Sequence, residues 1–404
     1  MQFIHQKFDV RFQYPVHFTE SLFDPANSLL AEVMQQGEGA GPRKAVFVLD
    51  EGLCRAWPRL PEAIQAYCKS YSDKVALAHP LLLVPGGESV KNDHCHVEAV
   101  QRMINDAGIC RHSYVVAVGG GAVLDMVGFA AAAAHRGVRL IRIPTTVLAQ
   151  DDSAVGVKNS VNAFGKKNFL GAFAPPHAVI NDSDFLTTLS DRDWRCGISE
   201  AVKVALIKDA DFFGSIESDA AALASRDIAA MKPLIYRCAQ LHLNHIADGG
   251  DAFELGSSRP LDFGHWAAHK LEQLTDFALR HGEAVAIGIA LDTTYSYLTG
   301  RLPESDWRRI IDLLRSLGFA LYSPAMDACL DDPQGSHGLL SGLDEFQEHL
   351  GGQLTIMLLE RIGKGIEVHE IAPEIMIESI ARLRNIHCAH AEAAPISGGR
   401  TYAA

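Results

Sequence analysis

The sequence predicts an α/β domain built on a parallel β-sheet, followed by a mostly α-helical domain. Before about residue 190, short apolar runs alternate with helical patterns, and beyond that point helical periodicity dominates. The length of 404 residues is also too great for one ordinary hydrophobic core. We therefore expect an α/β domain at residues 1–188 and a helical domain at residues 189–388. Residues 389–404 are rich in Ala, Gly and Ser, and we expect them to form a disordered tail.

Four short apolar runs predict the strands of the first domain, at residues 44–48, 81–84, 114–118 and 140–143. Helical spacing is present at residues 21–35 and 89–107, and a stretch of small residues at 123–134 follows a glycine turn that opens a helix. Runs that are apolar throughout suit strands buried on both faces, as in a parallel sheet covered by helices.

The second domain shows long helical patterns and very little strand-like sequence. The helices are expected at residues 192–208, 226–246, 267–277, 283–298, 305–317 and 373–384. Residues 354–359 form a strand-like run in this half.

Composition excludes several classes of partner. The net charge of −13 argues against nucleic-acid binding, which needs a basic face, but it allows a phosphorylated small substrate held by a few local cations. The most apolar stretches are far shorter than the roughly 20 residues that span a bilayer, and the N-terminus lacks a signal-peptide pattern. The eight cysteines form no CxxC pair. We expect a cytoplasmic protein with reduced thiols that binds neither membranes nor nucleic acid.

Two glycine-rich turns follow successive predicted strands. Gly119, Gly120 and Gly121 open a helix, where backbone N–H groups can approach a pyrophosphate, and Asp125 lies one turn further along. This is not the GxGxxG fingerprint, so a plain strand-to-helix turn without a ligand remains an alternative.

The other turn, Pro85–Gly87, is followed by Glu88 and Lys91, spaced as ribose and phosphate contacts would be. Two such turns suit a dinucleotide at the carboxyl edge of the sheet. A solvated helix start is the alternative reading of Glu88 and Lys91.

A possible metal site is spread over the helical half. Glu200 and Lys203 share one face of a predicted helix, and His265 and His269 share a face if a helix begins just before them. His281 lies at the start of the next helix. Two imidazoles and one carboxylate, with an open position, suit a catalytic Zn²⁺ or a similar divalent ion. The chain has 18 histidines, so chance spacing is the alternative.

The polar run at residues 151–168 follows Thr145 and Thr146 at the end of a predicted strand. Lys158 and Asn168 within it could both donate to a phosphate. A surface loop would have a similar composition, but this one lies where open α/β sheets bind ligands.

Several segments together resemble signature segments of the sugar phosphate cyclase superfamily, which includes 3-dehydroquinate synthase. They are IPTTVLAQDDSAVGVKNSVNAFGKKNFLGAFAPP, GISEAVKVALIKDADFF, LDFGHWAAHKLE and HGEAVAIGI. The resemblance runs in order from about Leu83 to Gly288, and more weakly to Gly363. It implies a Rossmann-like NAD domain, a C-terminal helical metal domain, a site in the cleft between them, and a homodimer.

The resemblance also implies roles for individual residues. The metal ligands, for Zn or Co, would be Glu200, His265 and His281. The NAD-binding positions would be Asp50, Glu88, Lys91, Gly119, Gly120, Gly121, Asp125, Thr145, Thr146 and Lys167. The catalytic polar groups would be Asp152, Lys203, Asp262 and His269. The phosphate would contact Lys158, Asn168 and His269, together with Arg136 lent across the dimer.

The chemistry implied is that of a phosphate-eliminating carbon–oxygen lyase. The metal polarises a substrate hydroxyl, and NAD⁺ takes its hydride to leave a ketone that acidifies the neighbouring C–H. Phosphate then leaves, NADH returns the hydride, and the opened ring recloses by an intramolecular aldol.

The chain departs from 3-dehydroquinate synthase where that enzyme holds the carboxylate of its substrate. Ser258 occupies the position where that enzyme has an Arg, and Arg259 comes one residue too late. His242 occupies the position where that enzyme has a Lys. Asp262 replaces the Asn of the motif LNFGH. Gln347 and Glu348 occupy the positions where a pair of Lys residues is expected near the C-terminus. An unpaired buried carboxylate costs several kcal/mol, so these changes favour a ketose phosphate without one.

With Asp at this position, the motif resembles that of the sedoheptulose 7-phosphate cyclases, which make valiolone-type cyclitols. Those enzymes usually lack the second histidine of the motif, which is retained here as His269. The whole pattern resembles the cyclase-like proteins of bacterial Ebo-type clusters. We therefore expect a C7-cyclitol synthase acting on sedoheptulose 7-phosphate. The alternatives are a 3-dehydroquinate synthase acting on the shikimate heptulosonate phosphate, an NAD-dependent polyol dehydrogenase of the glycerol dehydrogenase type, and a non-catalytic NAD-binding protein.

Overall fold

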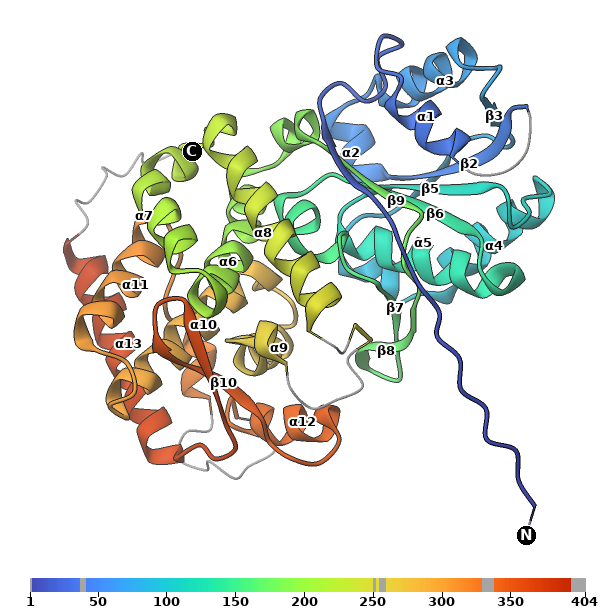
Figure 1. Cartoon of the computed structure of the whole chain (residues 1–404). Helices are drawn as coiled ribbons and strands as arrows, with labels where there is room; N and C mark the ends of the chain where they lie inside the picture. Colours follow the sequence, from blue (N-terminus) through green and yellow to red (C-terminus); the bar gives the residue numbers. More distant parts are fainter. Residues whose placement is uncertain (1, 37–40, 250–251, 254–258, 329–337, 394–404) are drawn as a thin grey trace, which may run out of the picture. The chain divides into compact units, whose positions relative to one another are not determined.

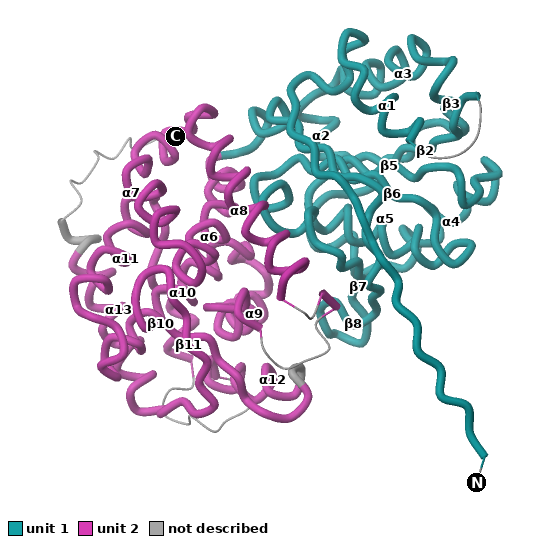
Figure 2. The backbone as a smooth tube through the Cα atoms, viewed as in Figure 1, with its two compact units in different colours: residues 1–190 teal, residues 191–404 magenta. Residues whose placement is uncertain are grey.

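The computed structural model describes residues 2–36, 41–249, 252–253, 259–328 and 338–393. The chain divides into two compact units, residues 1–190 and 191–404, which are coloured separately in Figure 2. Within the described residues no helix is long and apolar enough to cross a membrane. The seven cysteines that the structure describes are all free thiols.

Unit 1 is built on a seven-stranded sheet in the order β1-β9-β6-β5-β2-β3, with β4 also paired to β2 (Figure 1). Every pairing in this sheet is parallel. Its strands are β1 (Val16–Thr19), β2 (Arg43–Asp50), β3 (Val75–Leu77), β4 (Leu82–Val84), β5 (Tyr114–Gly119), β6 (Arg139–Pro144) and β9 (Ala178–Asp182). All six residues of β5 are buried, as expected for a central strand with helices on both faces. The predicted Rossmann-like α/β class is confirmed.

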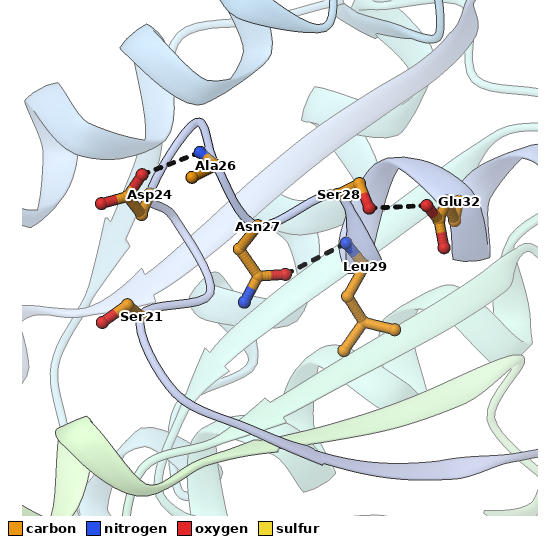
Figure 3. Close-up of a pocket in the computed structure, with 7 residues that line it drawn as sticks. All are labelled: Ser21, Asp24, Ala26, Asn27, Ser28, Leu29 and Glu32. Carbon is orange, nitrogen blue, oxygen red and sulfur yellow. Dashed lines mark hydrogen bonds between the residues drawn. The ribbon is translucent and has the colours of Figure 1, made fainter.

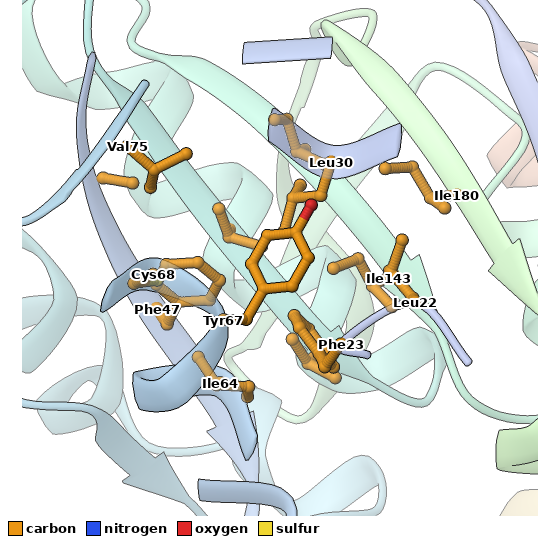
Figure 4. Packing of buried hydrophobic residues seen from close by; sticks show 14 of the residues in the cluster. Leu22, Phe23, Leu30, Phe47, Ile64, Tyr67, Cys68, Val75, Ile143 and Ile180 are labelled. Carbon is orange, nitrogen blue, oxygen red and sulfur yellow. The ribbon is translucent and has the colours of Figure 1, made fainter. Parts of the chain in front are cut away.

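The helices of unit 1 are α1 (Leu29–Gln35), α2 (Glu51–Ala56), α3 (Leu60–Ser70), α4 (His94–Asp106) and α5 (Gly121–Ala133). Shorter helical turns are η1 (Glu88–Lys91), η2 (Ala134–Arg136), η3 (Ala149–Ser153) and η4 (Ser183–Thr188). One core lies between the sheet and α1 and α3, where Figure 4 shows the ring of Tyr67 among Phe23, Leu30, Ile143 and Ile180.

The helix expected at residues 21–35 begins only at Leu29. The side chain of Asp24 accepts from the backbone N–H of Ala26 at 2.8 Å, and that of Asn27 accepts from Leu29 at 3.1 Å. Such local bonds offer the backbone an alternative to the helix. Figure 3 shows the pocket that this turn region forms, lined by Ser21, Asp24, Ala26, Asn27, Ser28, Leu29 and Glu32. It contains no residue that the sequence singles out for a role.

The polar run after β6 forms a turn of π-helix, η3, and then an antiparallel hairpin of β7 (Lys158–Ala163) and β8 (Lys166–Phe173). Arg142 of β6 is fully buried and organises this run. Its Nη1 donates to the carbonyls of Ala154 and Gly156 at 2.9 and 2.7 Å. Its Nη2 donates to the carbonyl of Lys158 at 2.9 Å and to Asn159 Oδ1 at 2.6 Å. One buried guanidinium therefore fixes the backbone between η3 and the hairpin.

Unit 2 contains α6 (Asp191–Lys208), α7 (Ala210–Ala224), α8 (Ile228–Asp248), α9 (His265–Leu274), α10 (His281–Leu298), α11 (Glu304–Ser316), α12 (Ser341–Leu350) and α13 (Pro373–Ala393). The 3-10 turns η5 (Pro260–Asp262) and η6 (Pro324–Asp327) and a hairpin of β10 (Ile356–Arg361) and β11 (Lys364–Val368) complete it. Helix α10 is buried almost along its whole length and contacts α6, α9, α11 and α13. Because α13 continues to Ala393, the first five residues of the expected tail at 389–404 are helical, and the rest lies outside the described residues.

We expect Arg142→Met to lower the free energy of unfolding by about 3 kcal/mol or more, since it leaves several buried carbonyls without their donor. Arg111→Met, at an exposed position of the same unit, should change it by less than about 0.5 kcal/mol. Urea-induced unfolding of the two variants measures the difference. Equal changes in the free energy of unfolding for the two variants would show that Arg142 does not organise this segment.

Candidate functional site

Three helices of unit 2 bring Glu200, His265 and His281 together. Glu200 lies in the middle of α6, and the two histidines are the first residues of α9 and α10. Glu200 Oε1 is 3.6 Å from His265 Nε2 and 3.4 Å from His281 Nε2. One ligand atom from each residue lies within 4.8 Å of the others. The three residues that the sequence proposes as metal ligands are therefore close enough to share one ion.

Two close backbone contacts make this approach possible. Gly282 is next to His281. If Gly282 carried a side chain, its Cβ would lie 2.0 Å from the carbonyl oxygen of Cys196 on α6, which is too close. A Cβ at Gly288 would lie 2.0 Å from the carbonyl oxygen of Gly264, just before α9. Gly264 itself has φ +78°, a left-handed conformation that side chains disfavour. Glycine at these positions therefore lets α6 and the start of α9 lie directly against α10.

The partners of the two imidazoles define which nitrogen carries the proton. His265 Nδ1 is 3.2 Å from the carbonyl oxygen of Phe263, and His281 Nδ1 is 3.2 Å from Glu272 Oε2. Both partners accept hydrogen bonds, so Nδ1 of each ring can donate, and Nε2 is then the nitrogen that a neutral ring offers to a metal ion. Burial is the main cause that lowers the pKa of His265 well below 6.5, so this ring is neutral. Two imidazole lone pairs and the oxygen of Glu200 thus converge on one point.

This arrangement fits a divalent ion. Ligand atoms about 2.1 Å from a tetrahedral ion lie about 3.4 Å apart, close to the distances between Glu200 and the two histidines. Without a cation, three acceptor atoms would face one another in a buried space, at an electrostatic cost. Two histidines and one carboxylate also leave a coordination position for a substrate oxygen, as catalytic sites require.

The second oxygen of Glu200 is held by Lys203. The distance from Lys203 Nζ to Glu200 Oε2 is 2.5 Å, and both side chains are buried. Burial alone would raise the pKa of Glu200, but its contacts, above all with the charge of Lys203, lower it to about 2. The carboxylate therefore stays ionised and available to an ion at neutral pH.

His269 lies near this centre, and Asp262 lies in the turn that leads into α9. The ring of His269 is exposed, and its centroid is 5.5 Å from that of His265 and 5.9 Å from that of His281. Asp262 ends the turn η5 and is half-buried, three residues before His265. The structure thus brings two further predicted residues to the same end of α9.

Sequence reasoning missed two buried carboxylates around the centre. Glu272 faces His281, as described above, and Asp292 of α10 accepts from Gly264 N at 3.0 Å and from Trp266 Nε1 at 2.9 Å. Burial raises the pKa of Asp292 to about 7. Glu272 lies seven residues after His265, two helical turns along the same face, so its spacing was a signal available in the sequence.

In unit 1, the carboxyl ends of β2, β4 and β5 meet around Asp50. A Cβ at Gly86, after β4, would lie 2.6 Å from the carboxylate of Asp50, and one at Gly119 would lie 3.2 Å from its Cβ. Asp50 Oδ1 accepts from the N–H of Gly52 at 2.6 Å, so it caps α2. The glycine turns are therefore needed for close packing at this edge.

Helix α5 begins at Gly121 after Gly120, and no side chain caps it. Thr145 N donates to the carbonyl of Gly119 at 3.0 Å, and the methyl group of Thr146 would lie 3.4 Å from a Cβ at Gly120. An uncapped helix start bounded by glycines suits an anionic group such as a pyrophosphate. The geometry supports the predicted dinucleotide site.

Lys91 connects several residues expected at that site. Its side chain is only 2% exposed, and Nζ lies 2.8 Å from Asp125 Oδ2 and 3.7 Å from Glu88 Oε1. The side-chain oxygen of Asn168 also accepts from Lys91, and it accepts from Ser160 Oγ at 2.9 Å. Asn168, predicted on the phosphate side, therefore lies beside residues predicted to contact NAD.

The structure does not group Lys158 with Asn168 in the β7–β8 hairpin. Lys158 is exposed at the base of the hairpin and pairs with Phe173, five residues along β8 from Asn168. Lys167, beside Asn168, is half-buried. Lys158 and Asn168 therefore lie at different positions along the hairpin, and their shared contact with a phosphate stays a prediction.

The remaining predicted residues are scattered over both units. Asp152 is half-buried in η3, and Arg136 is exposed after α5 with φ +61°. His242 is half-buried on α8, and Gln347–Glu348 lies on α12. Ser258 lies outside the described residues.

The class of protein follows from comparison with family models. Residues 81–196 match the model described as 3-dehydroquinate synthase N-terminal, and residues 197–331 match 3-dehydroquinate synthase C-terminal. The chain belongs to the 3-dehydroquinate synthase family. The predicted membership of the sugar phosphate cyclases, and with it a phosphate-eliminating enzyme, is confirmed at the level of the family.

Individual relatives refine this assignment. The chain is 35% identical over 322 residues to a 2-epi-5-epi-valiolone synthase of Streptomyces glaucescens, covering 78% of this chain and 77% of that protein. It is 34% identical over 378 residues to a 3-dehydroquinate synthase of Zymomonas mobilis, covering 91% and 92%.

Solved structures give the same result. A 2-epi-5-epi-valiolone synthase from Streptomyces hygroscopicus subsp. jinggangensis, with NAD⁺ and Zn²⁺ bound, has a TM-score of 0.83 and 27% identity, covering 95% of this chain and 100% of that one. A 2-deoxy-scyllo-inosose synthase complexed with carbaglucose-6-phosphate, NAD⁺ and Co²⁺ has a TM-score of 0.71 and 25% identity, covering 91% and 96%. A glycerol dehydrogenase of Schizosaccharomyces pombe, at a TM-score of 0.62 and 12% identity, shares the fold alone.

We expect Gly282→Ala to separate α10 from α6 and so to weaken metal binding, with a loss of about 3 kcal/mol or more in stability, because the new Cβ meets backbone. The control is Gly214→Ala in α7, where a Cβ would meet nothing within 4 Å. That change should stabilise the protein by about 0.5–1 kcal/mol, since alanine is the better helix former. Thermal unfolding and bound-metal analysis measure both. Normal metal content in Gly282→Ala would contradict the role assigned to this contact.

Proposed function

We propose that this protein is an NAD- and metal-dependent sugar phosphate cyclase that acts on a C7 ketose phosphate, sedoheptulose 7-phosphate. Its product would be a valiolone-type cyclitol. The observation that carries the proposal is the convergence of Glu200, His265 and His281 on one point, with the lone pairs of both imidazoles directed at the same carboxylate oxygen. Relatives of this family with NAD⁺ and either Zn²⁺ or Co²⁺ bound support the choice of cofactors.

When bound, NAD⁺ accepts and returns a hydride, and the divalent ion polarises a substrate oxygen. Glu200, His265 and His281 would hold the ion, and the uncapped start of α5 would hold the pyrophosphate of NAD⁺. Lys91, buried against Asp125, keeps the neighbouring polar groups in fixed positions at the same sheet edge.

The other polar groups would bind and orient the substrate. Lys203 keeps Glu200 ionised and would contact a substrate oxygen. His269, exposed beside the two ligand histidines, can donate to a phosphate oxygen. Asp152 and Asp262 are acceptors for sugar hydroxyls, and Lys158 is a further phosphate contact.

The charges around the centre support a substrate without a carboxylate. Asp262 adds a negative charge to the turn that leads into His265, three residues before this ligand in the chain. His242 stands where 3-dehydroquinate synthases are expected to have a Lys, and Gln347–Glu348 where they are expected to have a Lys pair. The likeness to a 2-epi-5-epi-valiolone synthase over 78% of the chain agrees with this choice.

The second candidate is 3-dehydroquinate synthase itself. It is favoured by the retained His269 and by relatives of that name that cover 91% of the chain. A polyol dehydrogenase is disfavoured, because glycerol dehydrogenases share only the fold.

Incubation of the purified protein with each of the two sugar phosphates tests the proposal. We expect sedoheptulose 7-phosphate to release inorganic phosphate and give a cyclitol, with no net change in NADH, and we expect a chelator to stop the reaction. Turnover of the shikimate heptulosonate phosphate alone would establish the second candidate. Net NADH formation without phosphate release would indicate a dehydrogenase.

We also propose a homodimer in which Arg136 of one subunit completes the phosphate site of the other. Arg136 is exposed and follows His135, and both have left-handed backbone angles, φ +61° and φ +52°. Two adjacent left-handed residues other than glycine cost energy, so a contact outside the monomer would explain them.

Mixing two inactive variants, Arg136→Ala and Glu200→Gln, tests this arrangement. In a mixed dimer, the site with an intact Glu200 receives an intact Arg136, so activity should recover to about a quarter of the wild-type value. No recovery under conditions where light scattering shows mixed dimers would contradict the shared site.

A further inference from the structure

We propose that Glu272 is a positioning residue that orients the ring of His281 and fixes the nitrogen that this ring offers to a metal ion. The inference rests on the proposed function, because it assumes that Glu200, His265 and His281 hold a divalent ion. Glu272 would not bind the ion itself, and it would act through His281.

The contact is specific and buried. Glu272 Oε2 lies 3.2 Å from His281 Nδ1, on the opposite side of the ring from Nε2, which faces Glu200 Oε1 at 3.4 Å. The side chain of Glu272 is only 5% exposed, whereas that of His281 is 25% exposed. A carboxylate that accepts the Nδ1 proton of a histidine leaves Nε2 unprotonated and makes it a stronger ligand.

His281 has a particular need for such a partner. It is the first residue of α10, so no preceding helical turn packs beside it, and the capping contact there joins Glu283 to the N–H of Arg280. His265 has a backbone partner in Phe263, but His281 receives its Nδ1 partner from another helix. Without Glu272, the ring of His281 could carry its proton on Nε2 or turn away from Glu200.

The contact is one half of a reciprocal arrangement between two helices. Glu272 of α9 holds His281 at the start of α10, and Asp292 of α10 holds Gly264 and Trp266 at the start of α9. Each helix therefore carries one predicted ligand and one carboxylate that fixes the start of the other helix. This links the geometry of both imidazoles to the packing of α9 on α10.

His269, Glu272 and His281 could alternatively hold a second ion, since one ligand atom of each lies within 4.8 Å of the others. We favour the positioning role because the Nδ1 proton of His281 already satisfies Glu272, whereas a second ion would need His281 to be deprotonated at both nitrogens. Metal stoichiometry distinguishes the two roles.

Cobalt binding to the full-length, metal-free protein tests the inference. We expect the wild type to bind one Co²⁺ per chain and Glu272→Gln to bind one Co²⁺ with 10- to 100-fold lower affinity, roughly the effect of losing such a partner. The visible spectrum of the bound Co²⁺ should also change, because the His281 ring shifts. NAD⁺ affinity should stay at the wild-type value.

Glu345→Gln is the matched control. Glu345 of α12 pairs with Lys270 of α9 at 2.5 Å, so the variant removes a carboxylate that contacts α9 without touching His281. It should bind Co²⁺ like the wild type. Glu272→Asp, which keeps the charge but shortens the reach, should also weaken Co²⁺ binding and replaces Glu272→Gln if that variant does not fold.

The outcomes separate the two levels of the argument. A wild type that binds no divalent ion would overturn the proposed function, and the inference with it. A wild type that binds Co²⁺, with unchanged affinity and spectrum in the Glu272 variants, would overturn the positioning role alone. Two Co²⁺ per wild-type chain and one per Glu272→Gln chain would show that Glu272 is a ligand.

Discussion

The helical unit depends on one electrostatic constraint: two imidazole nitrogens and a carboxylate oxygen are directed at the same buried point. Glu200 Oε1 lies within 3.6 Å of both Nε2 atoms, and each Nδ1 has an acceptor of its own, so the Nε2 lone pairs of neutral rings would face this oxygen. Acceptors facing acceptors are unfavourable unless a cation lies among them. The surrounding contacts, from Lys203 on one side to Glu272 on the other, keep this arrangement in place, and the chemistry of the family follows from it.

The α/β unit meets a different requirement. At the ends of β2, β4 and β5, glycines without side chains allow backbone N–H groups and the carboxylate of Asp50 to lie close together. Lys91 then neutralises Asp125 within a buried network. One unit thus supplies lone pairs for a cation, and the other supplies N–H groups for an anion. These are the two complementary needs of a reaction that uses both a metal and a dinucleotide.

Much of this could be predicted from the sequence, because its signals are local. The runs around β2, β4, β5 and β6 are apolar throughout, and Glu200, His265 and His281 stand in segments with a family pattern. The β7–β8 hairpin was missed, because the segment is rich in polar residues and glycine, and the fully buried Arg142 that organises it looks like any surface arginine in the sequence. Asp292 was missed because its partners lie 28 and 26 residues earlier, a distance over which no spacing rule applies.

The backbone contacts of Gly264 with Gly288, and of Gly282 with Cys196, have a consequence for how the centre acquires its ion. They join three helices through main-chain atoms, so the packing of the protein brings the ligand groups together, and these groups do not need to be assembled around the ion. Small metal-dependent domains behave differently and collapse only when loaded. A preformed set of ligands with an open coordination position can release one ion and accept another while the chain stays folded. The occupant inside a cell would then be decided by which divalent ions are abundant there.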